Sequence, residues 1–386
     1  MKTIVLIVTV EDSALTFYRN YVRFLRERGW EVTVVGNSSG ALETWAASEG
    51  ATGYHIPYER DPAMAKDFQT LLATIKLLRR IRPDAVVSAT PKAGLLGTLA
   101  AKFAGVPVRI YQLWGLRLET ERGLKRKILE ACERTTIRSA TQTVANSFSL
   151  ARAAEALGLA PADSIEVLGA GSSHGVNLKR FSRSAAGPVD DDTAAFLASD
   201  SDLTIVFIGR LTPDKGITTL LQAVDTARAR GLNIRLLLVG EVENQQLAEE
   251  VAGAEHIRRL DDVDDVRPYM TSADVLCLPT LREGFPNVVL EAAALEVPAI
   301  VTDATGAIDS VVDGETGWVF PVEDANALAE VIVEIVEQPE QLRQRGAAAR
   351  ARVEEHFEQV FMFGLQETNV AHQLQSPVAA EHVEAQ

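Results

Sequence analysis

The feature that most constrains the fold is a regular alternation of apolar strands with amphipathic helices. In the first half, strands are expected at residues 4–10, 31–35, 85–88, 108–112, around 144 and 165–168. Helical patterns at 17–28, 71–81, 94–103 and 124–136 separate them. Because strands that alternate with helices of this length form βαβ units, the pattern predicts a parallel sheet.

The alternation starts again after residues 182–200, a small, acidic segment broken by Gly187-Pro188. Strands are expected at 204–208, 234–239, 275–278 and 299–302, and helices at 216–228, 287–295 and 325–337. With 386 residues the chain exceeds the roughly 250–300 that one core serves. We therefore expect an α/β protein with two Rossmann-like, doubly wound domains that face each other across a cleft. The expected ranges are 1–182, 183–355, and a C-terminal helix with a flexible tail at 356–386, polar from about Gln366 onward.

Charge is unevenly divided along the chain. The net charge is −15, yet residues 1–183 hold 25 Lys and Arg against 17 Asp and Glu. The remaining residues hold 13 against 36, so this half is too acidic for general nucleic-acid binding. The basic clusters at residues 79–82 and 125–127 fit either solvated helix faces or contact with an anionic membrane. We leave both open.

Cysteine content and hydropathy bear on the cellular compartment. Two cysteines, Cys132 and Cys277, are too few for a disulfide framework or a metal site, and a reducing cytoplasm is expected. No stretch approaches the roughly 20 apolar residues that span a bilayer. The apolar residues 4–10 are cut off by Glu11-Asp12, which indicates a buried strand rather than a signal peptide.

The first chemical constellation lies where the strand at 204–208 ends. Gly209-Arg210 is followed by Lys215-Gly216, and a helix is expected to begin at Gly216. Backbone amides and the dipole at such a helix start can bind a phosphate, and Arg and Lys add fixed positive charge. A solvated loop with incidental charges is the alternative.

The second constellation pairs Glu283, in a loop, with Glu291, in the helix that Pro286 begins. Two carboxylates with seven residues between them could flank one site and accept hydrogen bonds from vicinal hydroxyls of a ribose or a pyranose. The alternative is that Glu283 caps the helix and Glu291 lies on the surface.

Together the two constellations resemble the family-4 retaining glycosyltransferases of the two-domain GT-B fold. Residues 239–241, 260–266, 273–279 and 310–319 fit the same pattern, so the resemblance covers the C-terminal domain. It implies that Arg210 and Lys215 bind the donor diphosphate, Glu291 the ribose, and Glu283 the transferred sugar. Arg210, Lys215 and Glu283 are the candidate catalytic residues. The implied donor-binding residues are Gly209, Arg210, Lys215, Leu260, Gly284, Phe285, Pro286, Asn287, Leu290 and Glu291.

The N-terminal half is similar to bacterial capsular and surface-polysaccharide members, through residues 90–97, 115–120 and 167–176. This similarity implies transfer of a hexose or N-acetylhexosamine, from a UDP-linked donor, to a glycan or polyprenyl-diphosphate-linked acceptor. The enzyme would work in the cytoplasm or at the inner face of the membrane. Lys92, Arg117 and His174 are candidates for the acceptor side.

Two departures from the family pattern stand in the N-terminal half. Residues 10–14 replace a Gly-Gly loop, and Leu113-Trp114-Gly115 stand where many members have a histidine, so we assign no catalytic histidine. We expect neither a cofactor nor a metal site. A dinucleotide-dependent oxidoreductase is disfavoured because Gly-x-Gly-x-x-Gly is missing after the first strand. A transferase with a soluble acceptor, or a non-catalytic nucleotide-sugar-binding protein, stays open.

Overall fold

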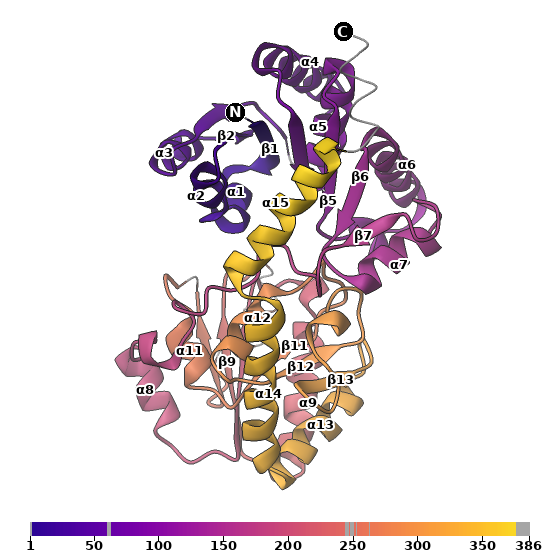
Figure 1. The fold of residues 1–386 in the computed structure, drawn as a ribbon. Coiled ribbons are helices and arrows are strands. Elements are labelled where there is room, and N and C mark those ends of the chain that lie inside the picture. Colours follow the sequence, from indigo (N-terminus) through magenta and orange to yellow (C-terminus); the bar gives the residue numbers. More distant parts are fainter. Residues whose placement is uncertain are drawn as a thin grey trace. The chain divides into compact units, whose positions relative to one another are not determined.

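The computed structural model describes residues 2–59, 63–243, 247, 251, 253–261 and 263–375. It divides into two compact units: the first holds the chain up to His174 and again from Val360, and the second holds Gly175–Gln359. Each unit is a sheet covered by helices (Figure 1). This division falls earlier than the expected boundary at 182, and the chain from Val360 belongs to the first unit. No helix within the described ranges is long and apolar enough to cross a membrane.

The first unit is built on a parallel sheet of seven strands in the described chain, in the order β3-β2-β1-β4-β5-β6-β7. The predicted parallel sheet is confirmed. The strands are β1 (Lys2–Val10), β2 (Trp30–Asn37), β3 (Thr52–His55), β4 (Ala85–Ala89), β5 (Val108–Leu113), β6 (Gln142–Ala145) and β7 (Ile165–Val167).

Helices cover both faces of this sheet, because alternate residues of β1 enter two different cores. Ile4 and Leu6 pack with α1 (Glu11–Phe17), α2 (Tyr21–Glu27) and α3 (Ala41–Ser48). Val5 and Ile7 pack with α4 (Met64–Ile81) and α5 (Pro91–Ala104). The remaining elements are η1 (Arg117–Glu119), α6 (Gly123–Ser139) and α7 (Phe148–Ala156). Burial on both faces explains why the strands are continuous apolar runs.

One helix expected at 17–28 is in fact two, and it begins earlier. Helix α1 starts directly after β1, with Glu11 and Asp12 in its first turn, where carboxylates favour the positive end of the helix dipole. Between α1 and α2 the chain turns at Asn20, whose φ is 65°. Asparagine tolerates this left-handed conformation better than most residues, and it interrupts the helix.

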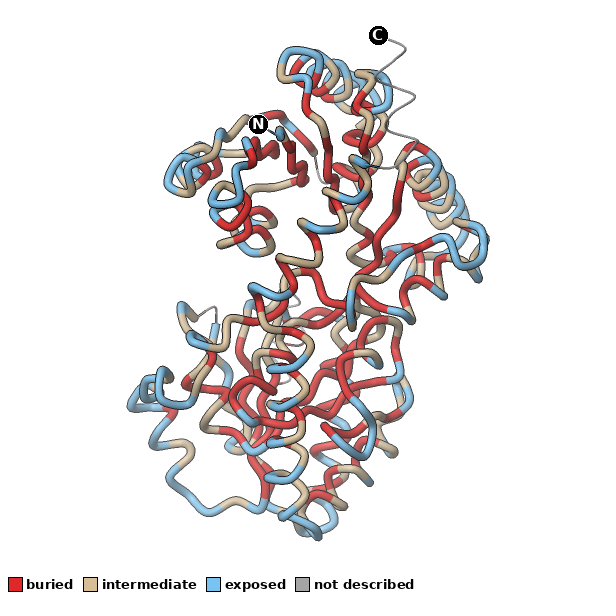
Figure 2. The backbone as a smooth tube through the Cα atoms, viewed as in Figure 1, coloured by how far each residue is buried: buried red, intermediate tan, exposed pale blue. Residues whose placement is uncertain are grey.

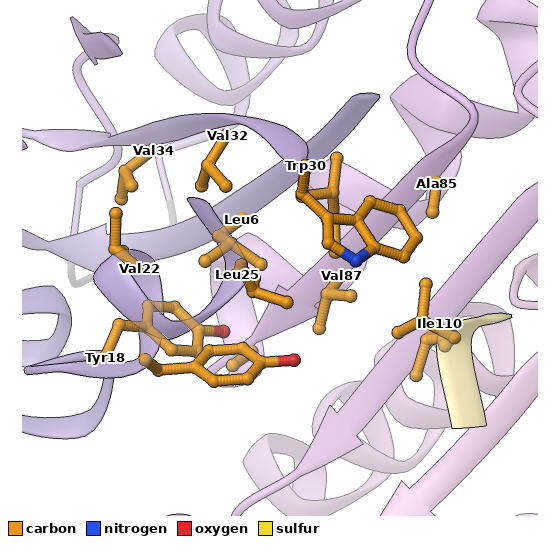
Figure 3. Close-up of a cluster of buried hydrophobic side chains, with 14 of the residues drawn as sticks. Leu6, Tyr18, Val22, Leu25, Trp30, Val32, Val34, Ala85, Val87 and Ile110 are labelled. Carbon is orange, nitrogen blue, oxygen red and sulfur yellow. The ribbon is translucent and has the colours of Figure 1, made fainter. Parts of the chain in front are cut away.

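The expectation of a flexible tail from Gln366 is wrong for residues 366–375; residues 376–386 lie outside the described chain. Helix α15 (Gln359–Gln375) continues to Gln375 and lies against the sheet of the first unit (Figure 1). Phe363 and Val370 join the buried cluster around Leu6, Tyr18 and Trp30, part of which Figure 3 shows. The Trp30 indole nitrogen donates to Glu367 at 3.0 Å, so tertiary contacts stabilise a helix that has little sequence periodicity.

The second unit has a parallel sheet in the order β10-β9-β8-β11-β12-β13. Its buried strands form the red core of that unit in Figure 2. The strands are β8 (Leu203–Ile208), β9 (Ile234–Val239), β10 (Ile257–Leu260), β11 (Val275–Leu278), β12 (Ala299–Thr302) and β13 (Gly317–Phe320). The helices are η2 (Arg183–Ala185), α8 (Asp191–Leu197), η3 (Pro213–Lys215), α9 (Ile217–Ala229), α11 (Arg267–Thr271), α12 (Asn287–Ala294), η4 (Ile308–Ser310), α13 (Ala325–Glu337) and α14 (Glu340–His356).

The strand order of the second sheet reverses between β8 and β11, and ligands of doubly wound sheets bind beyond the carboxyl ends of such strands. The loops that follow these two strands touch at Gly216. A methyl group at this position would lie 1.8 Å from the carbonyl oxygen of Pro279, and φ of Gly216 is 70°. Glycine is therefore required both by the space and by the backbone conformation.

Replacing Gly216 with alanine should lower the thermal unfolding midpoint sharply, because backbone would have to move; we expect a cost of at least about 3 kcal/mol. Gly231→Ala is a matched control, since φ there is also positive but no atom lies within 4 Å of the added methyl group. Its cost should be about 1 kcal/mol. Equal midpoints for the two variants would contradict the role of the Gly216–Pro279 contact.

Candidate active site

The candidate site lies at the carboxyl edge of the second sheet, where the backbone joins three loops. The Leu281 amide donates to the carbonyl of Asp214 at 2.9 Å, and the Glu283 amide donates to the carbonyl of Thr305 at 2.8 Å. A methyl group at Gly306 would lie 2.5 Å from the Glu283 carbonyl oxygen. The loops after β8, β11 and β12 are therefore fixed against one another before any ligand binds.

Lys215 and Glu283, predicted from separate motifs, are in direct contact. The Lys215 ammonium donates to Oε1 of Glu283, and both side chains are mostly buried, with 21% and 17% exposed. The pair brings the loop after β8 to the loop after β11. Because ions that leave water need a close partner, this pair keeps two charges in place at the sheet edge.

A second ion pair supports the first, and sequence analysis missed it. The Asp214 carboxylate accepts from Thr212 Oγ1 at 2.6 Å and from Arg282 Nη2 at 3.0 Å. Burial would raise the pKa of Asp214, but the Thr212 hydrogen bond and the charges of Arg282 and Lys215 together hold it below its ordinary value. Asp214 and Arg282 directly precede Lys215 and Glu283, and this adjacency was the available signal.

Arg210 is placed differently from Lys215. Its side chain is 61% exposed, and Nη1 lies 2.7 Å from Oε1 of Glu243. An exposed ion pair contributes little to stability, so the guanidinium can exchange Glu243 for another anion at small cost. Gly209, directly before it, donates its amide to the carbonyl of Val239 on the neighbouring strand at 2.9 Å.

Glu291 lies in the second turn of α12 and is partly buried. Burial raises the pKa of its carboxyl to about 7, and the positive charge of Arg180 opposes this shift. Sequence analysis missed Arg180, which is more than a hundred residues away in the chain. A carboxylate kept at such a cost is typical of a functional position.

The remaining donor-side candidates form the walls of this edge. Gly284, Phe285, Pro286 and Leu290 are buried, whereas Asn287, at the start of α12, and Leu260, at the end of β10, are partly exposed. The Phe285 ring packs on Phe357 at 5.4 Å between centroids. The Leu260 carbonyl accepts from the Gly240 amide at 3.0 Å, which fixes the end of β10 beside the loop after β9.

The three acceptor-side candidates belong to different segments of the first unit. Lys92, in the first turn of α5, lies 2.8 Å from Oδ1 of Asp67 on α4. Arg117, in η1, is exposed. His174 lies 2.8 Å from Ser173 Oγ and packs edge-on against Phe17, and burial lowers the pKa of its imidazole to about 4. His174 is therefore neutral at physiological pH.

Across the described residues, no group of three or more His, Cys, Asp or Glu side chains is arranged to hold a metal ion.

The raised pKa of Glu291 predicts how the ligand-free protein responds to pH. The folded state binds the proton with a pKa of about 7, above the ordinary value of 4.5, so its stability falls as the pH rises between these values. Glu291→Gln removes this cost, and should stabilise the protein by about 1–3 kcal/mol at pH 8 but hardly at pH 5. Thermal unfolding across this pH range measures the difference. Glu337→Gln is the control, because Glu337 is exposed. A stability difference between Glu291→Gln and wild type that does not change with pH would contradict the raised pKa of Glu291.

Comparison with known proteins places this geometry in a family. Residues 202–338 match the model of the glycosyl transferases group 1, and residues 15–171 match the glycosyl transferase 4-like domain. The chain is 36% identical over 357 residues to the capsular polysaccharide biosynthesis glycosyltransferase CapM of Staphylococcus aureus, covering 91% of this chain and 92% of CapM.

Solved structures agree on the fold. Sucrose-phosphate synthase from Thermosynechococcus elongatus is similar, with a TM-score of 0.78 at 20% identity, over 97% of this chain and 99% of that one. HepE from Anabaena, in complex with UDP-glucose, is similar with a TM-score of 0.76 at 16% identity, over 97% and 100% of the two chains. The two parallel sheets match these structures, as the sequence predicted. The chain belongs to the group 1, family-4-like glycosyltransferases and has the GT-B fold.

Proposed function

We propose that this chain is a retaining glycosyltransferase that moves a hexose or N-acetylhexosamine from a UDP-linked donor. The acceptor is a hydroxyl of a glycan or of a polyprenyl-diphosphate-linked sugar in surface polysaccharide synthesis. The contact between Lys215 and Glu283 at the carboxyl ends of β8 and β11 carries the proposal. The name of CapM supports the class of product, and the HepE complexes with UDP and with UDP-glucose support the donor.

The proposed reaction is a displacement at the anomeric carbon. The acceptor oxygen forms a bond to this carbon while the bond to the diphosphate oxygen breaks, both on the same face of the sugar. The hydroxyl proton passes to the departing diphosphate. Because attack and departure share one face, configuration is retained and no covalent intermediate with the protein is needed. Negative charge grows on the leaving group, and Lys215, Arg210 and the start of α9 are the groups that stabilise it.

Donor binding in this proposal exchanges the ion pairs of the free protein. Lys215 moves from Glu283 to the diphosphate, and Arg210 moves from its exposed partner Glu243. Glu283 is then available to accept hydrogen bonds from hydroxyls of the transferred sugar. Glu291, on α12, accepts from the ribose. The free site therefore holds its own charges in balance until the donor supplies new partners.

The acceptor side of the proposal rests on the first unit. Lys92 and Arg117 supply positive charge there, and a diphosphate-linked acceptor is anionic, so the charges are complementary. A lipid-linked acceptor places the enzyme at the cytoplasmic face of the membrane, where peripheral contact with anionic lipid is expected.

Product analysis tests this function. Ligand-free protein is first screened by thermal shift with UDP-linked hexoses and N-acetylhexosamines, since a ligand at 100 times its Kd adds about 2.7 kcal/mol of stability. The best donor is then supplied with polyprenyl-diphosphate-linked sugars or with soluble glycans, and the anomer is assigned by NMR. We expect an α-linked product from an α-linked donor. An inverted product would overturn the proposal. So would a donor that binds but is neither transferred nor slowly hydrolysed.

Lys215→Ala and Arg210→Ala should each lower turnover by about 10²–10³ with saturating donor, as expected for a group that stabilises a developing anion. The Michaelis constant for the donor should change less than turnover. Arg230→Ala is the control. Arg230 lies at the C-terminal end of α9, away from Lys215, and pairs with Glu330 of α13. Near-wild-type turnover in both site variants would exclude the diphosphate role.

The two carboxylates should separate in calorimetric titrations with UDP. Glu291→Gln should weaken UDP binding about tenfold, since a hydrogen bond to a charged group contributes about 1.5 kcal/mol or more. Glu283→Gln should leave UDP affinity within about threefold of wild type and slow sugar transfer instead. Equal losses of UDP affinity in both variants would show that Glu291 is not specific to the ribose and Glu283 is not specific to the transferred sugar.

A further inference from the structure

Large apolar side chains are exposed on α4 and α6, the helices on either side of α5, and Phe103 is exposed near the end of α5. On α4, Met64, Phe68 and Leu72 follow one another at intervals of four residues, which places them on one face. On α6, Leu124 and Ile128 are also four residues apart. These five side chains are between 50% and 90% exposed, far more than core residues of a water-soluble helix. Helix α5 packs against both α4 and α6 and lies between them (Figure 1).

The exposed charges on these three helices have one sign, although Lys66 and Lys125 pair with Glu59 and Glu121 next to the helices. The exposed charged residues on α4, α5 and α6 are all basic: Lys66, Lys76, Arg79, Arg80, Lys102, Lys125, Lys127 and Arg138. The acidic residues of the same helices are engaged, Asp67 with Lys92, Glu130 with Arg126, and Glu133 with the Tyr111 hydroxyl. We call this surface the α4–α6 face.

The other side of the same sheet differs. On α1, α2 and the residues next to them, exposed acids such as Asp12 and Glu27 are mixed with Arg19, Arg23 and Arg28. No large apolar side chain of the described helices α1, α2 and α3 is exposed. Val360 and Phe361 of α15 are exposed on this side. The two sides therefore differ in charge, because exposed acids are mixed with the bases here, whereas the exposed charges of the α4–α6 face are basic.

An anionic bilayer has the chemistry that fits this face. Apolar side chains of an amphipathic helix insert at the boundary of headgroups and acyl chains, and surrounding Lys and Arg lie at the level of the lipid phosphates. A second copy of the chain would bring like charges together face to face. We infer that the α4–α6 face docks peripherally on an anionic membrane, with Phe68, Leu72, Leu124 and Ile128 inserted.

The position of the apolar residues relates the docking face to the acceptor side of the site. This step rests on the proposed function. They lie in the first half of α4 and of α6, the ends nearest the carboxyl edge of the first sheet, because both helices begin there. Lys92 begins α5 at that same edge, and Arg117 lies in η1 between β5 and α6. Docking would therefore bring the acceptor-side candidates next to the bilayer that holds a lipid-linked acceptor.

Co-sedimentation of the full chain with vesicles tests the inference. Vesicles of phosphatidylcholine alone are compared with vesicles that also contain phosphatidylglycerol, across a salt series. Wild type should bind the anionic vesicles and lose much of this binding as salt rises, because charge attraction is screened within about 10 Å at 0.1 M. Phe68→Gln with Leu72→Gln, and Leu124→Gln with Ile128→Gln, should each lower partitioning about tenfold or more, since inserted apolar surface is lost.

Charge reversal and matched controls complete the experiment. Lys76→Glu with Lys127→Glu should lower partitioning at least about tenfold at low salt. Arg19→Glu with Arg28→Glu makes the same charge change on the other side of the sheet, and Ile308→Gln with Val312→Gln removes exposed apolar residues from the second unit. Both controls should bind like wild type. Equal binding by the α4–α6 variants and their controls would overturn the inference, as would a dimer in sedimentation velocity that the α4 variant dissociates.

UDP titration separates failure of this inference from failure of the proposed function. The donor-side residues lie in the second unit, so each vesicle-binding variant should retain wild-type UDP affinity if it is folded. Retained UDP affinity with unchanged vesicle binding refutes the docking face alone. Vesicle binding without any affinity of wild type for UDP refutes the proposed donor and leaves the docking face in place.

Discussion

The contact between the backbones of Gly216 and Pro279 is the constraint on which the donor-side edge depends. It brings the loop after β8 against the loop after β11, at the point where the strand order of the second sheet reverses. Any side chain at Gly216 would separate these loops, and with them Lys215 from Glu283. Because the contact is between main-chain atoms, it fixes the backbone positions from which the two charged side chains extend. This is the preorganisation that electrostatic catalysis requires.

Charge balance at this edge comes at a thermodynamic cost that the fold does not remove. Lys215 and Glu283 compensate each other, and Arg282 compensates Asp214. The carboxyl of Glu291 is partly buried, and the charge of Arg180 opposes the rise of its pKa. A buried carboxyl that is better protonated than charged destabilises the free protein at neutral pH. Such a position is expected where a ligand, rather than the fold, supplies the hydrogen-bond donors, and it exemplifies the conflict between stability and function.

Sequence patterns predicted the repeated βαβ arrangement well, because strands buried on both faces must be apolar along their whole length. Lys215, Glu283 and Glu291 could be named as candidates because each follows a predictable strand or helix start, and their roles stay a prediction. The pairing of Lys215 with Glu283 was not predicted, because contact between residues 68 apart depends on loop backbone that periodicity does not describe. A C-terminal helix was expected, but its continuation from Gln366 to Gln375 was missed for a related reason. Its stability comes from Phe363, Val370 and Glu367 packing on the first unit, and local sequence carries no record of a partner more than 300 residues away.

The loops at the point where the strand order reverses are joined differently in the two sheets. In the first sheet the order reverses between β1 and β4, and the chain segments at their carboxyl ends are joined by side chains: the hydroxyls of Thr9 and Thr90 lie 2.6 Å apart. Thr90 has φ 69° and ψ 150°, a conformation that costs a β-branched residue about 1–3 kcal/mol and persists only where surrounding contacts enforce it. The Thr9 hydroxyl also accepts from the Ala93 amide, so the strained residue fixes the first turn of α5, which carries Lys92. Glycine would relieve this strain but would lose the hydroxyl, whereas at Gly216 no side chain fits at all. Strain retained at the ligand-binding end of a sheet favours a functional role for that end, and it is independent support for placing the acceptor side there.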